Sequence, residues 1–447
     1  MMIQSINSKS HHCHTNASSA QRKESTVLKR VVVAAMAGSF IEWFEFSVYG
    51  YLAALMGQIF FANDSPAIQL IASFATFSVA FFARPFGGIV FGLIGDRIGR
   101  KTSLNLTLII MALATFCIGI LPSYASVGII SPILLVLMRL IQGFSSGGEI
   151  AGAAIFVAEH SKDHHRTFMT SWIEVGCIGG FIFGALTTGA LHYFFSQESL
   201  LDWAWRLPFL LAAPMALIGI YIRHRLEESP QFVSAEKRQT DSSEHISLSN
   251  MNNHKKALLC SAGLIIGTNI PLFIILTYMP SWLVSTLNLS TGKSLLMTVV
   301  PMFFLLFTIP LFGFLGDKIS RKKIMLIGYA GIIIFSWPCF IALHSGEILL
   351  QLAALIFLNL MLSLLLAGIL SKIPSLFPVK IRFTGMALSY NVAVALFAGT
   401  APMMNAWLIK MTGNPWVTAW YLMVGAGFGL MAILYTQDRT GCPMSGD

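Results

Sequence analysis

The seven residues Gly95-Asp96-Arg97-Ile98-Gly99-Arg100-Lys101 form a short charged loop between two long apolar runs. A near copy, Gly316-Asp317-Lys318-Ile319-Ser320-Arg321-Lys322, lies in the same setting about half a chain later. For a single loop of this kind, a basic cap that only sets the orientation of a helix is as good an interpretation as a functional one. Two copies in register indicate two parallel halves, which is typical of transporters with a site between their repeats.

Apolar runs fill most of the remaining sequence. Of the 447 residues, 55% are hydrophobic and only 11% are charged, whereas roughly a quarter of the residues in a soluble domain are charged. Each run is expected to be a helix, because lipid offers no partners to exposed backbone groups. The sequence thus predicts an all-α membrane protein with twelve transmembrane helices in two six-helix bundles, at about 28–55, 68–94, 104–121, 130–158, 167–195, 207–223, 257–285, 294–315, 324–343, 348–371, 382–410 and 416–436.

The longest polar connection separates the two halves and is rich in Ser, Asn and charged residues, as expected of a domain boundary. The predicted segments are a cytoplasmic tail at 1–27, an N-terminal bundle at 28–223, a cytoplasmic linker at 224–256, a C-terminal bundle at 257–436 and a cytoplasmic tail at 437–447.

The net charge of +9 does not indicate a nucleic-acid partner. Nearly all of the 29 Lys and Arg residues, Arg84 among them, fall on one side of the predicted spans. This asymmetry follows the positive-inside rule. We therefore expect a multi-pass protein of a bacterial cytoplasmic membrane, surrounded by lipid, with both termini in the cytoplasm.

The six cysteines are scattered, and four of them lie inside apolar runs, so they predict neither disulfides nor a zinc site. A cluster in the tail, His11-His12-Cys13-His14, has ligand types that bind metals. An accidental cluster in a tail without function is the preferred interpretation, and no metal site is predicted.

Further motifs accompany the charged loop. They are Glu42–Phe46, Arg84–Gly88, Arg139–Glu149, Trp205–Phe209, Glu227–Pro230, Leu276–Trp282 and Phe377–Arg382. Together they resemble the major facilitator superfamily, its metabolite:proton symporter branch and, within that branch, bacterial proline/glycine-betaine transporters. The resemblance runs from about 28 to about 435 and implies a proton-coupled transporter. Family members often carry Asp where this chain has Glu45 and Glu174, so the pocket is expected to differ in shape.

Ionisable residues inside the predicted spans all belong to the N-terminal half. They are Glu42, Glu45, Arg139, Glu149 and Glu174. Charges inside a bilayer are costly and usually mark ion or substrate paths. We therefore expect the N-terminal half to carry proton coupling, with the proton as coupling ion and no bound cofactor. Glu149 follows two glycines, so bonding to helix termini is an equally good interpretation of that residue.

Glu42 and Glu45 lie three residues apart on one helix face, at a depth similar to that of Arg139. We expect one carboxylate to pair with Arg139 and stay ionised, and the other to take up protons. The alternative is a purely structural ion pair that locks the first and fourth spans together.

Several aromatic and amide side chains are candidates for the substrate pocket. They are Trp43, Phe44, Trp172, Asn269, Tyr278, Trp282 and Asn391. A quaternary ammonium solute needs a few aromatic faces as a cage. Ordinary packing is the commoner role of any single aromatic residue in a span, and hydrogen bonding between helices is the alternative for the amides.

The repeated loops are interpreted as a conformational gate. An Asp near a helix end can accept hydrogen bonds at another helix N-terminus, and glycines permit the tight turn. The predicted gate residues are Arg84, Gly95, Asp96, Arg97, Gly99, Arg100, Asp317 and Arg321. Their contacts are expected to hold one conformation and to break in another.

One deep cation, Arg139, together with several carboxylates and aromatic residues, suits a zwitterion such as proline or glycine betaine. Its carboxylate is expected to meet Arg139, and its ammonium an aromatic face or a Glu. The protein is thus predicted to be a monomeric, proton-coupled importer rather than an enzyme, with a small-molecule solute as its partner.

Three alternatives remain open at this point. The solute is an organic acid of the 2-oxoglutarate, citrate or shikimate type, the protein is a channel, or it is a sensor of the same fold without transport. A membrane enzyme is disfavoured, because the sequence has no HExxH, GxSxG or P-loop motif.

Overall fold

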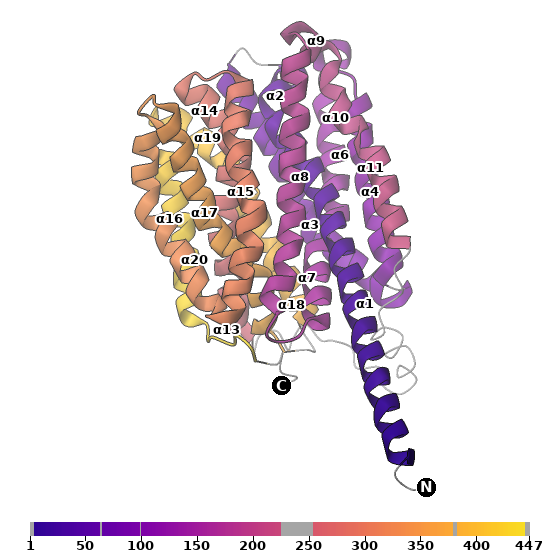
Figure 1. Ribbon diagram of the computed structural model, residues 1–447. Coiled ribbons are helices and arrows are strands. Elements are labelled where there is room, and N and C mark those ends of the chain that lie inside the picture. Colours follow the sequence, from indigo (N-terminus) through magenta and orange to yellow (C-terminus); the bar gives the residue numbers. More distant parts are fainter. Residues whose placement is uncertain (1–3, 63–64, 99, 225–253, 379–381, 443–447) are drawn as a thin grey trace.

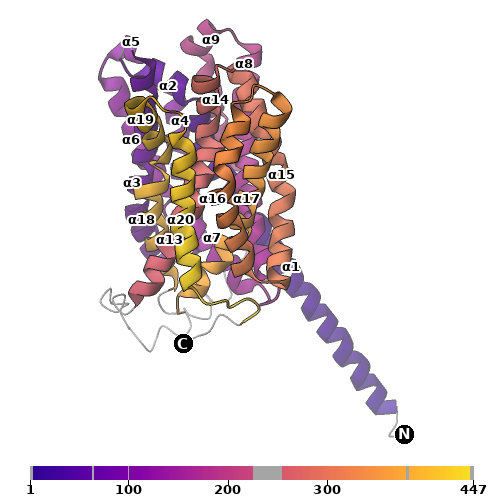
Figure 2. The same cartoon turned by 90° about the vertical axis from the view of Figure 1, so that its left-hand side faces the viewer.

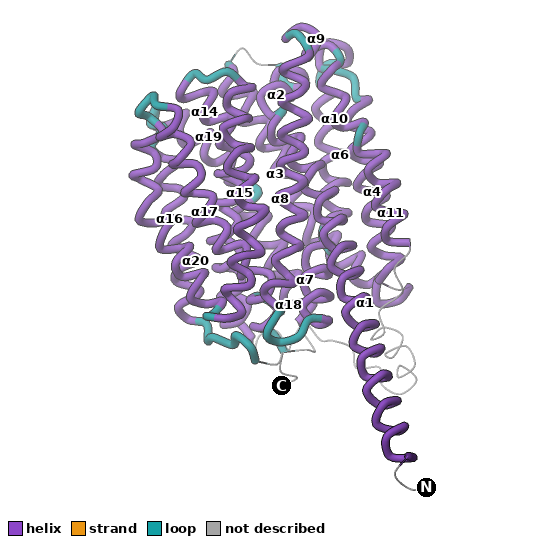
Figure 3. The backbone as a smooth tube through the Cα atoms, in the orientation of Figure 1, coloured by secondary structure: helices purple, strands orange, loops and turns teal. Residues whose placement is uncertain are grey.

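The computed structural model describes the backbone of residues 4–62, 65–98, 100–224, 254–378 and 382–442. Side chains are described within these ranges except at 4–26, 92–93, 95–98, 100–104, 222–224 and 383. The described part is entirely helix, turn and loop (Figure 3). The all-α prediction is thereby confirmed. The linker predicted at 224–256 lies largely outside the described residues.

Helices of the N-terminal half form one side of the molecule, coloured indigo to magenta in Figure 1. They are α1 (Gln4–Tyr51), α2 (Ala53–Phe60), α3 (Pro66–Ile98), α4 (Arg100–Ile120), α5 (Tyr124–Val127), α6 (Ile130–Ser146), α7 (Glu149–His160), α8 (Arg166–Phe194), α9 (Gln197–Asp202), η1 (Ala204–Arg206), α10 (Leu207–Leu210) and α11 (Ala212–His224). The first part of α1 extends beyond the bundle in both views (Figures 1 and 2).

Helices of the C-terminal half, orange to yellow, lie beside them. They are α13 (Lys255–Leu272), η3 (Phe273–Tyr278), α14 (Met279–Leu287), α15 (Thr291–Lys318), α16 (Arg321–Leu343), α17 (Ile348–Lys372), η4 (Pro374–Leu376), α18 (Arg382–Ala393), η6 (Val394–Ala398), α19 (Ala401–Thr412) and α20 (Val417–Tyr435). The halves meet chiefly where α8 packs on α15 and where α3 packs on α18 and α19. Helix α20 ends at the end of the bundle from which α1 projects, which is the predicted cytoplasmic end (Figure 1).

Eleven helical segments of the described chain are long and apolar enough to cross a membrane, and Asn105–Ile120 is a shorter apolar helix. Together they correspond to the twelve predicted spans. Large apolar side chains such as Phe307 (74% exposed) and Leu349 (80% exposed) point away from the protein. Lipid is the environment that would cover such side chains.

Close backbone contact between α3 and α6 explains the glycines of the fourth span. A Cβ on Gly143 would lie 1.7 Å from the carbonyl oxygen of Ala80, and one on Gly147 would lie 2.1 Å from that of Arg84. Small residues allow membrane helices to approach in this way. The approach fixes the backbone of α3 at Arg84 against the fourth span.

Three spans depart from regular α-helix near the middle of the molecule. The fourth span bends between α6 and α7, at Gly147 and Gly148. The seventh and eleventh spans contain the π-helical segments η3 and η6, and η3 begins two residues after Pro271. Short π-helical segments are frequent at functional sites. Both π-helical segments lie on the side of the C-terminal half that faces α1 and α3.

Candidate functional site

A buried ion pair lies at the centre of the N-terminal half. Nη2 of Arg84 on α3 donates to Oε1 of Glu42 on α1 at 2.8 Å, and the two side chains are 1% and 0% exposed. Burying two charges is costly unless they pair. The pair ties α3 to α1 at the level of the aromatic residues that line the contact between the halves.

This position of Arg84 corrects two predictions. Arg84 was expected on the cytoplasmic side and in the gate, yet it lies inside the membrane span Pro66–Phe91 of α3. Arg84 falls within the predicted span 68–94, and α3 passes through it as one helix to Ile98, so its side chain is buried inside the bundle, where Glu42 pairs with it. Arg84 is therefore a second deep cation beside Arg139.

A second polar network surrounds Glu45. Its Oε2 accepts hydrogen bonds from Thr115 Oγ1 and, at 3.3 Å, from Gln142 Nε2. Gln142 in turn accepts through Oε1 from Arg139, and its Nε2 also donates to Thr115 at 2.7 Å. Glu45, Arg139 and Gln142 are each 0% exposed. Arg139 is thus connected to Glu45 through the amide of Gln142.

The expected direct pair between Arg139 and one of the two glutamates is therefore corrected. Glu42 pairs with Arg84, and Glu45 reaches Arg139 through Gln142. Oε1 of Glu45 has no hydrogen-bond partner among the described residues. Glu45 thus lies among neutral hydrogen-bond donors, whereas Glu42 lies beside a cation.

Aromatic rings surround both guanidinium groups. Cζ of Arg84 lies 4.7 Å from the ring centroids of Phe46 and Phe81, and Cζ of Arg139 lies 4.3 Å from Tyr49 and 5.1 Å from Phe46. Such contacts stabilise buried cations by about 2 kcal/mol each. Phe46 therefore contacts the cations of both networks.

Sequence reasoning missed several of these residues. Phe81 lies three residues before Arg84, and Gln142 lies three residues after Arg139, so each shares a helix face with its cation. That spacing was the available signal for both. Thr115 carries no such local signal, because it comes to the site only through tertiary packing.

Glu149 and Glu174 are the two remaining buried glutamates among the predicted site residues. Glu149 is the first residue of α7, where a helix N-terminus favours a carboxylate, and it is 2% exposed. Glu174 lies on α8 and is 7% exposed. Glu174 is close enough to Tyr390 of α18 for an electrostatic interaction between the halves.

Three of the pocket candidates lie where the halves meet. The ring of Trp43 lies 5.8 Å from that of Phe273, and the ring of Tyr278 lies 5.7 Å from that of Phe74. Nδ2 of Asn391 donates to the carbonyl of Gly147 at 2.6 Å, at the bend of the fourth span.

The other four candidates pack within their own half. The ring of Phe44 lies 5.3 Å from that of Phe183 in a tilted arrangement, and Trp172 contacts Phe168. Asn269 donates to the carbonyl of Ile265 in its own helix. The indole of Trp282 packs on Phe340 and His344. These are packing contacts and a hydrogen bond within one helix, and the role of the four side chains in a substrate pocket stays a prediction.

At the predicted cytoplasmic end, Asp317 caps a helix of the other half. Its two carboxylate oxygens accept hydrogen bonds from the backbone N–H groups of Thr167 and Phe168, each at 2.9 Å. These groups belong to the first turn of α8, whose N–H groups lack partners within the helix. Asp317 therefore connects the end of α15 to the start of α8, and its role in a conformational gate stays a prediction.

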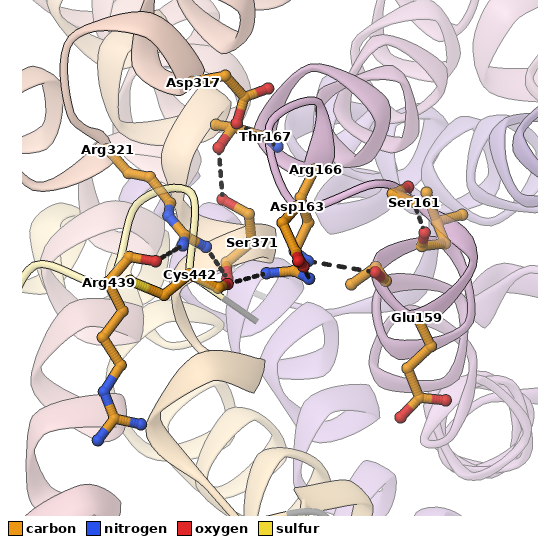
Figure 4. Close-up of polar contacts among 12 residues, drawn as sticks. Glu159, Ser161, Asp163, Arg166, Thr167, Asp317, Arg321, Ser371, Arg439 and Cys442 are labelled. Carbon is orange, nitrogen blue, oxygen red and sulfur yellow. Dashed lines mark hydrogen bonds and ion pairs between the residues drawn. The ribbon is translucent and has the colours of Figure 1, made fainter. Parts of the chain in front are cut away.

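Further contacts surround this cap, and Figure 4 shows those of Arg166 and Arg321. Arg382 pairs with Glu159 at 3.2 Å, and Arg166 donates to the carbonyl of Cys442 at 3.2 Å. Arg321 donates to the carbonyls of Ser371, at 3.0 Å, and Arg439. The segment after α20 is thus held against both halves.

The first copy of the gate loop cannot be compared with the second. Gly99 lies outside the described residues, and the side chains of Gly95, Asp96, Arg97 and Arg100 lie outside the described side chains. Their role in the gate stays a prediction. The same holds for metal binding by His11, His12, Cys13 and His14.

Three comparisons with known proteins agree with this arrangement. Residues 30–254 match the family model described as sugar (and other) transporter. The chain is 40% identical over 427 residues to the glycine betaine/proline/ectoine/pipecolic acid transporter OusA of Dickeya dadantii, covering 94% of this chain and 85% of the relative. It is 39% identical over 427 residues to the proline/betaine transporter of Salmonella typhimurium, again covering 94% of this chain and 85% of the relative.

Among solved structures, the chain resembles the major facilitator superfamily proton:xylose symporter XylE bound to 6-bromo-6-deoxy-D-glucose. The TM-score is 0.76 at 18% identity, over 94% of this chain and 98% of that one. At this identity the likeness shows the fold alone.

Proposed function

Because the chain belongs to the sugar (and other) transporter family of the major facilitator superfamily, we propose that it is a symporter which moves a small zwitterionic solute across the membrane together with protons. Proline and glycine betaine, named in the titles of the relatives OusA and the Salmonella transporter, are the solutes proposed for this chain. The protein is a multi-pass membrane protein and a transporter rather than an enzyme.

The observation that carries the substrate class is the pairing of opposite charges among aromatic rings where the halves meet. Arg84 and Glu42 offer one partner to each charge of a zwitterion, and Trp43, Phe46 and Phe81 offer faces to an ammonium group. A site for a sugar or an uncharged solute does not need two buried ions of opposite sign.

Glu45 is proposed as the proton carrier. A carboxyl group that alternates between neutral and charged forms needs neutral donors that tolerate both, and Thr115 and Gln142 are such groups. Gln142 connects this carboxyl to Arg139, so protonation of Glu45 changes what Arg139 can bind. Glu149 and Glu174 are proposed to support coupling from the predicted cytoplasmic half of the path.

Alternating access is proposed to proceed by rocking of two bundles, 28–223 and 257–436, about the central contacts. Contacts of the Asp317 cap, together with the pair Arg382–Glu159, close the predicted cytoplasmic end in this conformation. The orientation with both termini in the cytoplasm of a bacterium and the monomeric state are parts of the same proposal.

One observation favours a second candidate. Arg84 is a second buried cation, and two cations, Arg84 and Arg139, suit an organic acid with two carboxylates. Glu42 neutralises Arg84 in this structure, so of the two only Arg139 remains as a cation without a paired carboxylate among the described residues. A zwitterion is therefore preferred over a dicarboxylate as the solute.

Uptake into proteoliposomes separates the two candidates. The purified full-length protein would be tested with radiolabelled proline, glycine betaine, 2-oxoglutarate, citrate and shikimate under an imposed inward proton gradient. Accumulation of proline or glycine betaine that a protonophore abolishes is expected. Accumulation of an organic acid alone supports the second candidate. Flux at channel rates without need of a gradient, or no flux of any solute, would refute symport of either kind.

A further inference from the structure

The guanidinium of Arg84 occupies a box of aromatic rings. Its Cζ lies 4.7 Å from the centroids of Phe46 and Phe81 and 5.9 Å from that of Trp43. Phe273 from the C-terminal half completes the enclosure, because its ring lies 5.2 Å from Phe81 and 5.8 Å from Trp43. We call these four aromatic side chains the aromatic box. It has walls from α1, α3 and η3, and so from both halves.

The box leaves polar atoms without partners. Nε of Arg84 and Nε1 of Trp43 have no hydrogen-bond partner in the described part of the chain, although both residues are at most 2% exposed. Buried donors are nearly always satisfied by protein groups or by water, so these two donors are available to an acceptor that enters the contact between the halves. Their partner must carry hydrogen-bond acceptors.

We infer, on the basis of the proposed function, that the Arg84–Glu42 pair and the aromatic box are the binding site of the zwitterion. Without solute, each member of the pair occupies the place of one solute charge: Glu42 is the anion beside Arg84, and Arg84 is the cation beside Glu42. The solute's carboxylate takes Arg84, and its ammonium group takes Glu42 and the aromatic faces that now contact the guanidinium. The solute's carboxylate is thus assigned to Arg84 rather than to Arg139, the partner expected from the sequence.

The box also suggests how binding reaches the proton network. Phe46 contacts the guanidinium of Arg84 and that of Arg139 at 5.1 Å. A solute that draws Arg84 away from Phe46 changes the packing of a ring shared with Arg139, which is joined to Glu45 through Gln142. The two networks are distinct in their hydrogen bonds and share one aromatic side chain.

The experiment exploits the cation that Arg84 supplies. Equilibrium binding of radiolabelled glycine betaine and of radiolabelled choline, a quaternary ammonium without a carboxylate, is measured on the purified full chain. The Arg84→Gln variant should lose affinity for glycine betaine by about tenfold or more. It should gain affinity for choline over wild type, because Glu42 and the aromatic box are then left without their cation.

Arg206→Gln is the matched control. Arg206 also stacks on a tryptophan, with Cζ 4.5 Å from the ring of Trp205, but it lies outside the box. This variant should bind both ligands as wild type does. Unchanged affinity of Arg84→Gln for glycine betaine, or a loss without a gain for choline, would overturn the inference.

A second variant covers failure of Arg84→Gln to fold. Phe273→Leu keeps an apolar side chain and both ions, and should weaken glycine betaine binding by about fivefold through loss of a cation–π face. Phe183→Leu is its control, because Phe183 packs on Phe40 and Phe44 away from the box. Equal affinities of Phe273→Leu and wild type would contradict the inference. Absence of binding of proline and glycine betaine by wild type would instead refute the proposed function itself.

Discussion

Replacing Asp317 by Asn tests the gate most cleanly. The change keeps the shape of the side chain and removes its charge. In the structure both carboxylate oxygens accept backbone hydrogen bonds at 2.9 Å, from Thr167 and Phe168 of the other half. An amide offers only one acceptor oxygen, so one of the two hydrogen bonds is lost and the other weakens.

The size of the effect follows from these two contacts. A hydrogen bond to a charged group contributes about 1.5–3 kcal/mol net. A carboxylate at a helix N-terminus contributes about 0.3–1 kcal/mol. Asn retains part of the sum, which leaves a loss of about 2 kcal/mol. That loss shifts the balance between the closed and open predicted cytoplasmic ends by roughly thirtyfold.

The assay is the labelling rate of a cysteine hidden by the closed gate. Ser171 on α8 is 0% exposed, and its Oγ lies 2.8 Å from where a Cβ on Gly313 of α15 would be. With the native cysteines replaced by Ser, a Ser171→Cys variant reacts with a water-soluble thiol reagent only when the halves separate. Adding Asp317→Asn should raise this rate by roughly thirtyfold if opening precedes labelling.

Glu347→Gln is the control. Glu347 is the N-cap residue of α17, but its side chain makes no hydrogen bond to the helix, so the variant removes a carboxylate without removing a cap. It should leave the rate unchanged. An equal rate in Asp317→Asn and its parent would refute the role of the cap in closing the gate. An equal rise in both variants would show that general loss of charge, rather than the cap, controls opening.

Three further predictions follow from the structure. Glu45→Gln should abolish accumulation of solute against a gradient and leave counterflow exchange intact, because an amide carries no proton; loss of both activities, or of neither, would contradict this role. Gly143→Ala should lower the melting temperature of the purified protein by several degrees or prevent folding, because its Cβ meets a carbonyl oxygen at 1.7 Å, whereas Gly148→Ala, with open space around it, should not. Burial raises the pKa of Asp438, but hydrogen bonds from Ser320 and Thr440 outweigh it and hold the pKa below its ordinary value of 3.8. The segment after α20 should therefore be held at neutral pH and released as the pH falls below that value, and Asp438→Asn should release it at neutral pH. The measurement is hydrogen exchange at the amide of Thr440, which donates to Asp438 at 3.1 Å. Equal exchange rates in the variant and wild type at neutral pH would contradict this prediction.

The fold was predictable because its signals are local. Apolar runs of sufficient length predict spans wherever they occur, and the repeat of Asp96 in Asp317 revealed the two halves without any contact being known. The burial of Glu42, Glu45 and Arg139 followed from their place inside such runs.

The pairing of buried charges was not predictable in the same way. Depth along a helix placed Glu42 near Arg139, but depth says nothing about which helix faces meet. The cation beside Glu42 is Arg84 of α3, whose side chain meets that of Glu42 only in the folded bundle. Phe273 joins the aromatic box only because η3 packs on α1 and α3, a contact that no spacing in the sequence encodes.

The central claim is that solute and proton cross together, and the proton is the direct test. Wild-type protein is reconstituted with a pH-sensitive dye in the vesicle lumen, and glycine betaine or proline is added outside without any imposed gradient. Acidification of the lumen that depends on the solute and is erased by a protonophore is the predicted result. Solute entry without any acidification would contradict the account, because it would show transport uncoupled from protons.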